Sequence, residues 1–175
     1  MQFNKTLLAA TLLTAGGFAA ISSANAADTS DFKVTTTIDA SCTVDASGAN
    51  IVFGTIAANT LAEATTISNK ASAEGILVTC SKGAPYVIKL ASAGITSTTG
   101  EGKMIGTGVN DNTITYQLNS TDTGTAWGNL ESNDVTGTGL GLSTAVPHLV
   151  YATITGSTDV KEDTYTDTIT ASITY

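Results

Sequence analysis

Residue types that enzymes use for acid–base or nucleophilic chemistry are sparse in this sequence. The single histidine, His148, lies in "VPHLVYATI" at the start of an expected strand, and no Gly-x-Ser-x-Gly motif accompanies it. Glu162 and Asp163 are adjacent carboxylates that could act as an acid–base pair, but they lie in an expected turn that faces water. We therefore interpret His148 as a partly exposed strand residue and predict no catalytic residues and no enzyme.

Two further groups could bind a ligand. "GVNDNT" offers side-chain oxygens of Asn110, Asp111 and Asn112 to calcium, but it has one carboxylate and lacks the closing glutamate of an EF-hand loop. Trp127 could stack on a sugar, although a lone tryptophan in a small β-domain is more often a core or loop anchor. A hairpin loop and a packing residue are the favoured interpretations, with no metal and no cofactor.

Cys42 and Cys80 are the two cysteines of the chain. In an oxidising compartment, an even pair is interpreted first as a disulfide. Two free or metal-binding thiols are the alternative, but no further metal ligands lie near them in the sequence. On the chain-entropy model, a disulfide closing this loop would stabilise the fold by roughly 4 kcal/mol.

Residues 1–26 have the features of an export signal. Lys5 supplies one positive charge, an uncharged apolar run follows from Thr6 to Ile21, and Ala24-Asn25-Ala26 forms a small-x-small cleavage site. We expect a signal peptide whose removal leaves Ala27 as the first residue. A membrane anchor is the alternative, but the run is short for a bilayer and no charged stop follows it.

What remains is about 150 residues, enough for one domain with a hydrophobic core. It carries all fifteen acidic residues of the chain, against six lysines and no arginine. Binding to nucleic acid or to an anionic membrane requires clustered Lys and Arg. The composition therefore argues against both partners, and the acidity favours solubility of an exported protein.

Turn clusters divide this region into short runs rich in Thr, Val, Ile and Tyr, a pattern typical of strands. "CSKGAPY" is expected to form a hairpin, "TGEGK" to be a turn, and "NTLAEATTISNKASAEG" to be an irregular connection rather than a helix. Short strands at such spacing predict an all-β fold, specifically a two-sheet β-sandwich. The expected strands are Asn50–Ile56, Glu74–Cys80, Tyr86–Ala91, Thr113–Asn119, His148–Thr155 and Thr164–Tyr175.

A further strand signal opens the mature chain in "DFKVTTTIDASC". Phe32, Val34, Thr36 and Ile38 fall on one face of an extended chain, and no Gly or Pro turns the chain back before Cys42. An exposed apolar strand is an aggregation liability, so it must find an edge elsewhere. Addition to an open groove in another copy, known as donor-strand complementation, would satisfy it.

The ordered set of segments resembles the spore coat protein U family and, within it, the major pilins of archaic (Csu-type) chaperone-usher pili. The resemblance covers essentially the whole mature chain. The segments that carry it are "DFKVTTTIDASCTV", "IVFGTI", "GILVTCSKGAPYVIKL", "KMIG", "ITYQLNS", "AWGN" and the closing "TYTDTITASITY".

The resemblance implies an incomplete immunoglobulin-like β-sandwich that lacks its final strand and is completed by a donor strand from a neighbouring subunit. Residues 27–41 would form the donor strand and residues 42–175 the pilin domain. Thr36 departs from a fully apolar donor set. By this resemblance, Phe32, Val34, Thr36 and Ile38 match the donor strand, Cys42 and Cys80 the disulfide, and Ile169, Ala171, Ile173 and Tyr175 the strand that borders the groove and pairs with the chaperone.

The implied function is that of the major shaft subunit of an adhesive pilus, for surface attachment and biofilm formation. The implied partners are identical subunits in a head-to-tail polymer, a periplasmic chaperone, an outer-membrane usher, and minor and tip pilins. The protein would pass through the periplasm to the cell surface. A spore or cell-envelope coat protein of the same family and a secreted carbohydrate-binding β-sandwich are the alternatives, and a tip adhesin would need a further domain.

Overall fold

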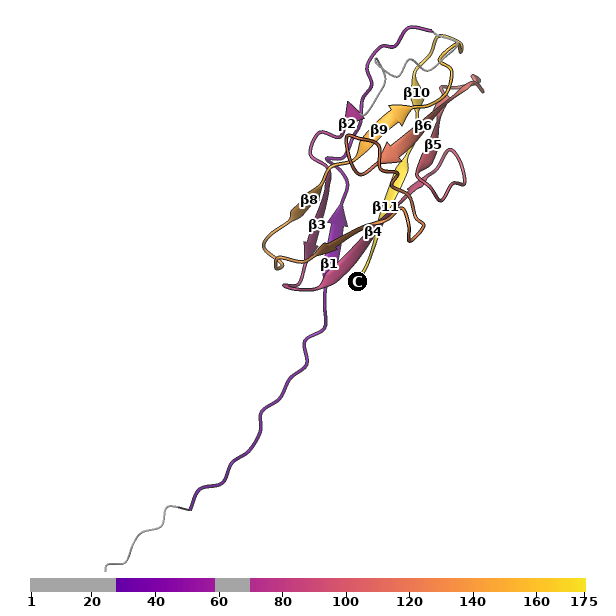
Figure 1. Cartoon of the computed structure of the whole chain (residues 1–175). Coiled ribbons are helices and arrows are strands. Elements are labelled where there is room, and N and C mark those ends of the chain that lie inside the picture. Colours follow the sequence, from indigo (N-terminus) through magenta and orange to yellow (C-terminus); the bar gives the residue numbers. More distant parts are fainter. Residues whose placement is uncertain (1–27, 59–69) are drawn as a thin grey trace, which may run out of the picture. The chain divides into compact units, whose positions relative to one another are not determined.

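The computed structural model describes residues 28–58 and 70–175 (Figure 1). The chain divides into two units, Met1–Thr37 and Ile38–Tyr175. The described residues form strands and loops and no helix, hence none that could cross a membrane. The strands are β1 (Cys42–Asp45), β2 (Lys70–Ala71), β3 (Ile76–Cys80), β4 (Pro85–Ser92), β5 (Glu101–Gly106), β6 (Thr113–Asn119), β7 (Val135–Thr138), β8 (Val146–His148), β9 (Tyr151–Ile154), β10 (Tyr165–Thr166) and β11 (Ile169–Thr174).

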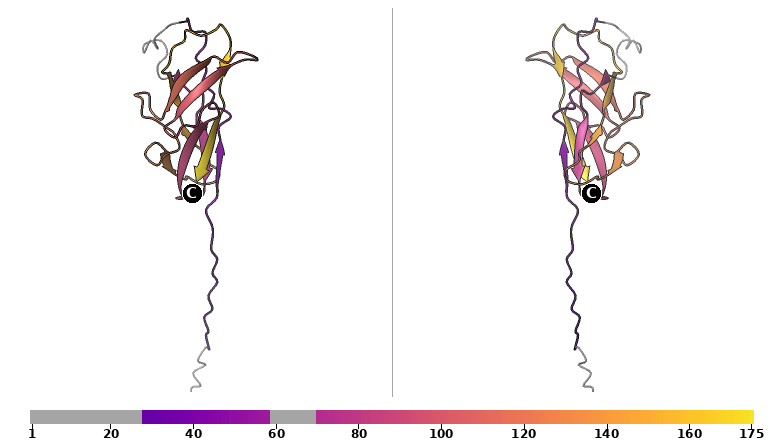
Figure 2. Two further views of the ribbon diagram at one scale, coloured as in Figure 1. Left: turned by 90° about the vertical axis from the view of Figure 1, so that its right-hand side faces the viewer. Right: turned by 90° about the vertical axis from the view of Figure 1, so that its left-hand side faces the viewer.

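Within residues 28–58 and 70–175, the strands form three antiparallel sheets, with the orders β1-β3-β8, β10-β5-β6-β9-β2 and β11-β4-β7. The all-β class is confirmed, but the expected pair of sheets is wrong. Two expected strands each change sheet midway. His148–Thr155 is divided between β8, which pairs with β3, and β9, which pairs with β6. Thr164–Tyr175 is divided between β10, which pairs with β5, and β11, which lies beside β4 (Figure 2).

The expected hairpin at "CSKGAPY" is also wrong. β3 pairs with β1 and β8, whereas β4 pairs with β11 and β7. The turn between them, with Gly83 at φ 79°, therefore carries the chain from one sheet to another. The sequence correctly predicts a turn here, but a turn does not show whether the strands on either side of it pair with each other.

Asn50–Ile56, expected to be a strand, forms none. Ile51, Phe53 and Ile56 are half-buried and pack against the core, whereas Val52 is 70% exposed. The alternation that predicted a strand is therefore present, but ladder pairing is not. Most of the expected connection Asn59–Gly75 lies outside the described residues, and its end includes β2.

The other expected strands are found, and β6 has the expected bounds. β5 and β7 were not expected, because their glycines resemble turn residues. Gly102 pairs with Tyr116, and Gly137 pairs with Tyr86. A Cβ atom at either glycine would lie within 2.3 Å of the tyrosine ring, so each glycine makes room for the aromatic side chain that covers it.

The core contains the single tryptophan of the chain, Trp127. Trp127 is fully buried, and its Nε1–H donates a hydrogen bond to the carbonyl of Ile88 at 3.0 Å. The interpretation of Trp127 as a core anchor is confirmed. A buried indole ring cannot stack on a sugar, so Trp127 gives no support to the carbohydrate-binding alternative.

Cys42 and Cys80 are directly opposite each other across β1 and β3, with their Cα atoms 4.1 Å apart, and they form a disulfide. Cys80 is fully buried. The bond therefore links β1, at the end of its sheet, to a strand of the core. This pairing is consistent with export to an oxidising compartment.

We expect the Cys42→Ser, Cys80→Ser double variant to lose roughly 4 kcal/mol of unfolding free energy, because the unfolded chain is no longer constrained. Urea denaturation of the exported subunit measures this loss. Alkylation of the native wild-type protein, followed by mass spectrometry, should label neither cysteine until reductant is added. Labelling without reductant would contradict the bond.

Candidate strand-binding groove

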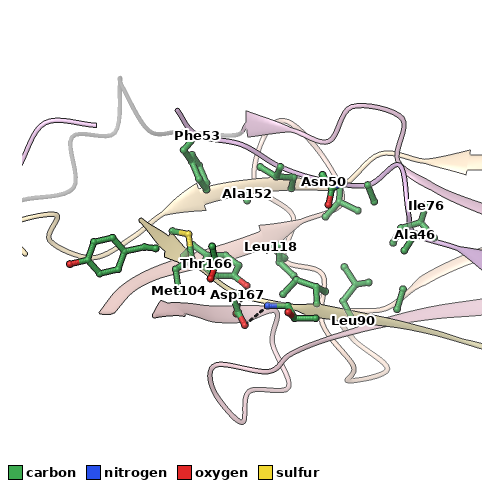
Figure 3. Close-up of a pocket in the computed structure, with 18 residues that line it drawn as sticks. Ala46, Asn50, Phe53, Ile76, Leu90, Met104, Leu118, Ala152, Thr166 and Asp167 are labelled. Carbon is green, nitrogen blue, oxygen red and sulfur yellow. Dashed lines mark hydrogen bonds between the residues drawn. The ribbon is translucent and has the colours of Figure 1, made fainter. Parts of the chain in front are cut away.

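A cavity of about 360 Å³ lies between two segments of the domain that are far apart in sequence (Figure 3). One wall comes from residues 46–53 and the other from residues 165–171. The floor between them is formed mainly by apolar side chains of the sheets, namely Ile76, Leu90, Met104, Tyr116, Leu118 and Ala152, together with Val150 between β8 and β9. We call this cavity the groove.

Among the described residues, strand pairing is incomplete along both walls. β10 and β11 each stand at the end of their sheet, so each has a strand neighbour on one side. Residues 46–53 belong to no strand, although Ile51 and Phe53 face the groove. A strand at the end of a sheet offers main-chain N–H and C=O groups to a further strand. The groove therefore has the features of a site for an added strand.

Side chains along β11 alternate between the groove and solvent. Of the four residues expected to border a groove, Ile169 and Ala171 line it. Ile173 shares their parity and packs against the core, beyond the cavity. Tyr175 is 61% exposed and lines a separate hollow beside β4 and β7.

Asp167 lies at the break between β10 and β11 and is the one charged residue among the described residues that line the groove. Its Oδ1 accepts hydrogen bonds from the N–H groups of Gly94 at 3.0 Å and Thr168 at 2.7 Å. Its Oδ2 accepts from the hydroxyls of Ser92 at 2.5 Å and Tyr116 at 2.6 Å. Burial, and then the bond to Asp167, raises the pKa of Tyr116. These bonds fix the carboxylate in place beside the mainly apolar floor of the groove.

A second polar cluster holds the loop that had been considered as a calcium site. Asp163 accepts hydrogen bonds from the Thr107 hydroxyl, from the Thr107 N–H at 2.9 Å and from Asn110 Nδ2 at 2.7 Å. The buried Asn110 also accepts from the N–H of Asn112 at 3.1 Å. The loop joins the paired strands β5 and β6, so the hairpin-loop interpretation is confirmed. Asn110 is engaged in holding this loop together.

The hydrogen bonds to Asp163, first those from Thr107 and Asn110, lower its pKa well below the ordinary value. Its stabilising contribution is therefore fully present above the unfolded pKa of about 3.9 and is lost as pH falls toward the folded pKa. We expect Asp163→Asn to lower the urea midpoint more at pH 6 than at pH 2.5. Glu162→Gln, at the neighbouring exposed carboxylate, is the matched control and should show no such difference. Identical pH profiles for the two variants would contradict the assignment.

His148 ends β8 rather than beginning a strand. Its Nε2 lies 2.8 Å from the hydroxyl of the buried Tyr86, and the two rings meet edge-to-face with their centroids 5.7 Å apart. Burial lowers the pKa of His148. These contacts link the ends of two sheets and give the histidine a packing role.

Residues 28–41, which include most of the expected donor strand, form no strand. Phe32 and Val34 are each 87% exposed, Ile38 is 85% exposed, and Thr36 is also exposed. Their role as a donor strand stays a prediction. The wall at residues 46–53 was not anticipated as part of a site. The alternation of Ile51 and Phe53 was the available signal.

The Spore Coat Protein U domain is the family whose model matches this chain, over residues 28–172. The chain therefore belongs to the spore coat protein U family, which includes the Csu-type archaic pilins. This family is structural and adhesive, and its members are generally not enzymes. A comparison with curated proteins gives no match.

Proposed function

We propose that this protein is the major shaft subunit of an archaic chaperone-usher adhesive pilus, and that it polymerises by donor-strand complementation. The groove is the observation that carries the proposal. Its floor is largely apolar, and among the described residues β10 and β11 each have a strand neighbour on one side alone. The chain also has a segment, Phe32 to Ile38, whose apolar side chains are exposed. The groove of one copy lacks a strand, and the amino-terminal segment of another copy can supply that strand.

The energetics favour a durable contact. Burial of Phe32, Val34 and Ile38 would stabilise the contact by roughly 5–9 kcal/mol before entropy, at ~1.5–3 kcal/mol for each side chain. Main-chain hydrogen bonds to β11 and to residues 46–53 would add to this. Because the donor and the groove are different surfaces of the subunit, the contact is head-to-tail and generates an open filament.

In this proposal, residues 1–26 are the signal peptide, residues 27–41 the donor strand and residues 42–175 the pilin domain. A periplasmic chaperone covers the groove before assembly, because an exposed apolar groove with open strand edges would aggregate. An outer-membrane usher then exchanges the chaperone for the next donor strand. Minor and tip pilins complete a cell-surface fibre that serves attachment and biofilm formation.

Immunogold microscopy with antibodies against this protein tests the shaft assignment. Gold along the full length of surface fibres is the expected result. Gold at one end of each fibre would contradict the shaft role and favour a minor subunit. Gold spread over the envelope without fibres would contradict the pilus and favour a coat protein.

A further inference from the structure

Burial alternates along one wall of the groove, and one of the half-buried residues is charged. The four half-buried positions that line the groove are Tyr165, Asp167, Ile169 and Ala171, whereas Thr166 and Thr168 border the groove but are exposed. Figure 3 shows Asp167 between Met104 and Leu90 along the groove. The polar position is therefore the third of the four, counted from Ala171.

The donor segment has the same arrangement of one polar position among four. Its residues of one parity are Phe32, Val34, Thr36 and Ile38. Thr36 is the polar one, and it is the third of the four, counted from Phe32. The two patterns match when the strands run in opposite directions.

We propose that the donor strand of a second copy lies antiparallel to β11 with Thr36 opposite Asp167, so that Asp167 sets the register of assembly. This inference rests on the proposed function and adds the register to it. Val34 then lies opposite Ile169 and Ile38 opposite Tyr165. Phe32, the largest side chain of the four, lies opposite Ala171, the smallest residue of the wall.

Asp167 acts by excluding other registers. Each carboxylate oxygen of Asp167 already accepts two hydrogen bonds within the subunit. The proposed register therefore does not depend on a further hydrogen bond from Thr36 to Asp167. A slip of two residues would place Val34 or Ile38 against the carboxylate and cover a charged group with apolar atoms. It would also move Thr36 against Ile169 or Tyr165. Specificity would thus come mainly from a penalty on wrong pairings.

Other arrangements fit less well. A slip of one residue would turn the apolar face of the donor toward solvent. A parallel donor with Thr36 opposite Asp167 would place Phe32 opposite Asp163, beyond the groove, and would place Ala40, outside the four donor positions, opposite Ala171. The antiparallel register is the one that sets all four donor positions against the four wall positions and also places Thr36 opposite Asp167.

Cysteine pairs between subunits test this register in polymer from cells that make the whole chain. Residues directly opposite in an antiparallel pair are close enough for a disulfide. Subunits carrying Val34→Cys and Ile169→Cys should give a ladder of multimers on a non-reducing gel. The pairs Val34→Cys with Ala171→Cys and Phe32→Cys with Ile169→Cys report slips of two residues in either direction and should stay monomeric. Each single-cysteine variant is a control.

The results separate the register from the proposed function. A ladder from a slipped pair alone would overturn the register but would leave donor-strand insertion intact. Polymer without a ladder from any pair would overturn the register, and normal polymer from a Val34→Asp subunit would overturn donor-strand insertion as well. The Thr36→Val variant then tests whether the polar Thr36 sets the register, and it leaves the groove unchanged. It makes the donor uniformly apolar, so ladders from the slipped pairs should appear at a yield comparable to that of the matched pair. If the matched pair alone still crosslinks, Thr36 and Asp167 do not set the register.

Discussion

Val34→Asp and Ile38→Asp are each expected to abolish the surface polymer while leaving the folded subunit at normal yield. In the subunit these side chains are 87% and 85% exposed, so a charge there remains in water. In the groove the same charge would meet an apolar floor without a partner, at a cost on the order of several kcal/mol. Even ~3 kcal/mol corresponds to about a hundred-fold loss of affinity.

The matched control is Thr35→Asp, which adds the same charge on the opposite face of the same segment. It should polymerise normally, because its side chain would point away from the groove floor. Subunit is measured in the periplasm as chaperone complex, and polymer is measured on the cell surface. Loss of the folded subunit in Val34→Asp would instead place Val34 in the protein's own core.

Filling the groove from within the chain is expected to produce the largest gain in stability. A second copy of "DFKVTTTIDA", joined to Tyr175 by a flexible linker, should make a monomer that needs no chaperone. An intramolecular donor acts as a ligand at high effective concentration and binds the folded state alone. With a net gain of a few kcal/mol, the thermal midpoint should rise by roughly 10 °C or more.

The control for the fusion carries aspartate in place of the valine of the appended copy. Its thermal midpoint should match that of the unfused chain, which would show that the gain depends on apolar contacts rather than on added length. Thermal unfolding followed by circular dichroism, with size-exclusion chromatography, measures both properties. Equal midpoints for the fusion and the unfused chain would remove the groove as a donor site.

Strong alternation in the sequence predicted the interior strands well, and β6 has the expected bounds. The same alternation could not show where a strand changes sheet, because side chains continue to alternate while the main-chain partner changes. The breaks before β9 and before β11 are of this kind. At the second break, Asp167 interrupts an otherwise apolar face, and that interruption was the visible sign of the change.

The hardest residues to predict were those whose structural role depends on a residue far away in the sequence. Gly102 and Gly137 resemble turn residues until Tyr116 and Tyr86 are seen to cover them across the sheet. Residues 50–56 have a strand pattern but no partner strand among the described residues. The donor residues were found from their alternation and the groove-edge residues from a family resemblance, whereas the opposite wall at residues 46–53 required the three-dimensional structure.

Electron cryo-microscopy of the native surface fibre is the most direct test of donor-strand assembly. We expect one strand of density along the free edge of β11, between residues 165–171 and residues 46–53 of each subunit. That strand should trace to residues 32–38 of the neighbouring subunit, with Phe32, Val34 and Ile38 directed at the groove floor. A groove that is empty in the fibre, or that is filled by its own subunit's amino-terminal segment, would contradict assembly by donor-strand complementation.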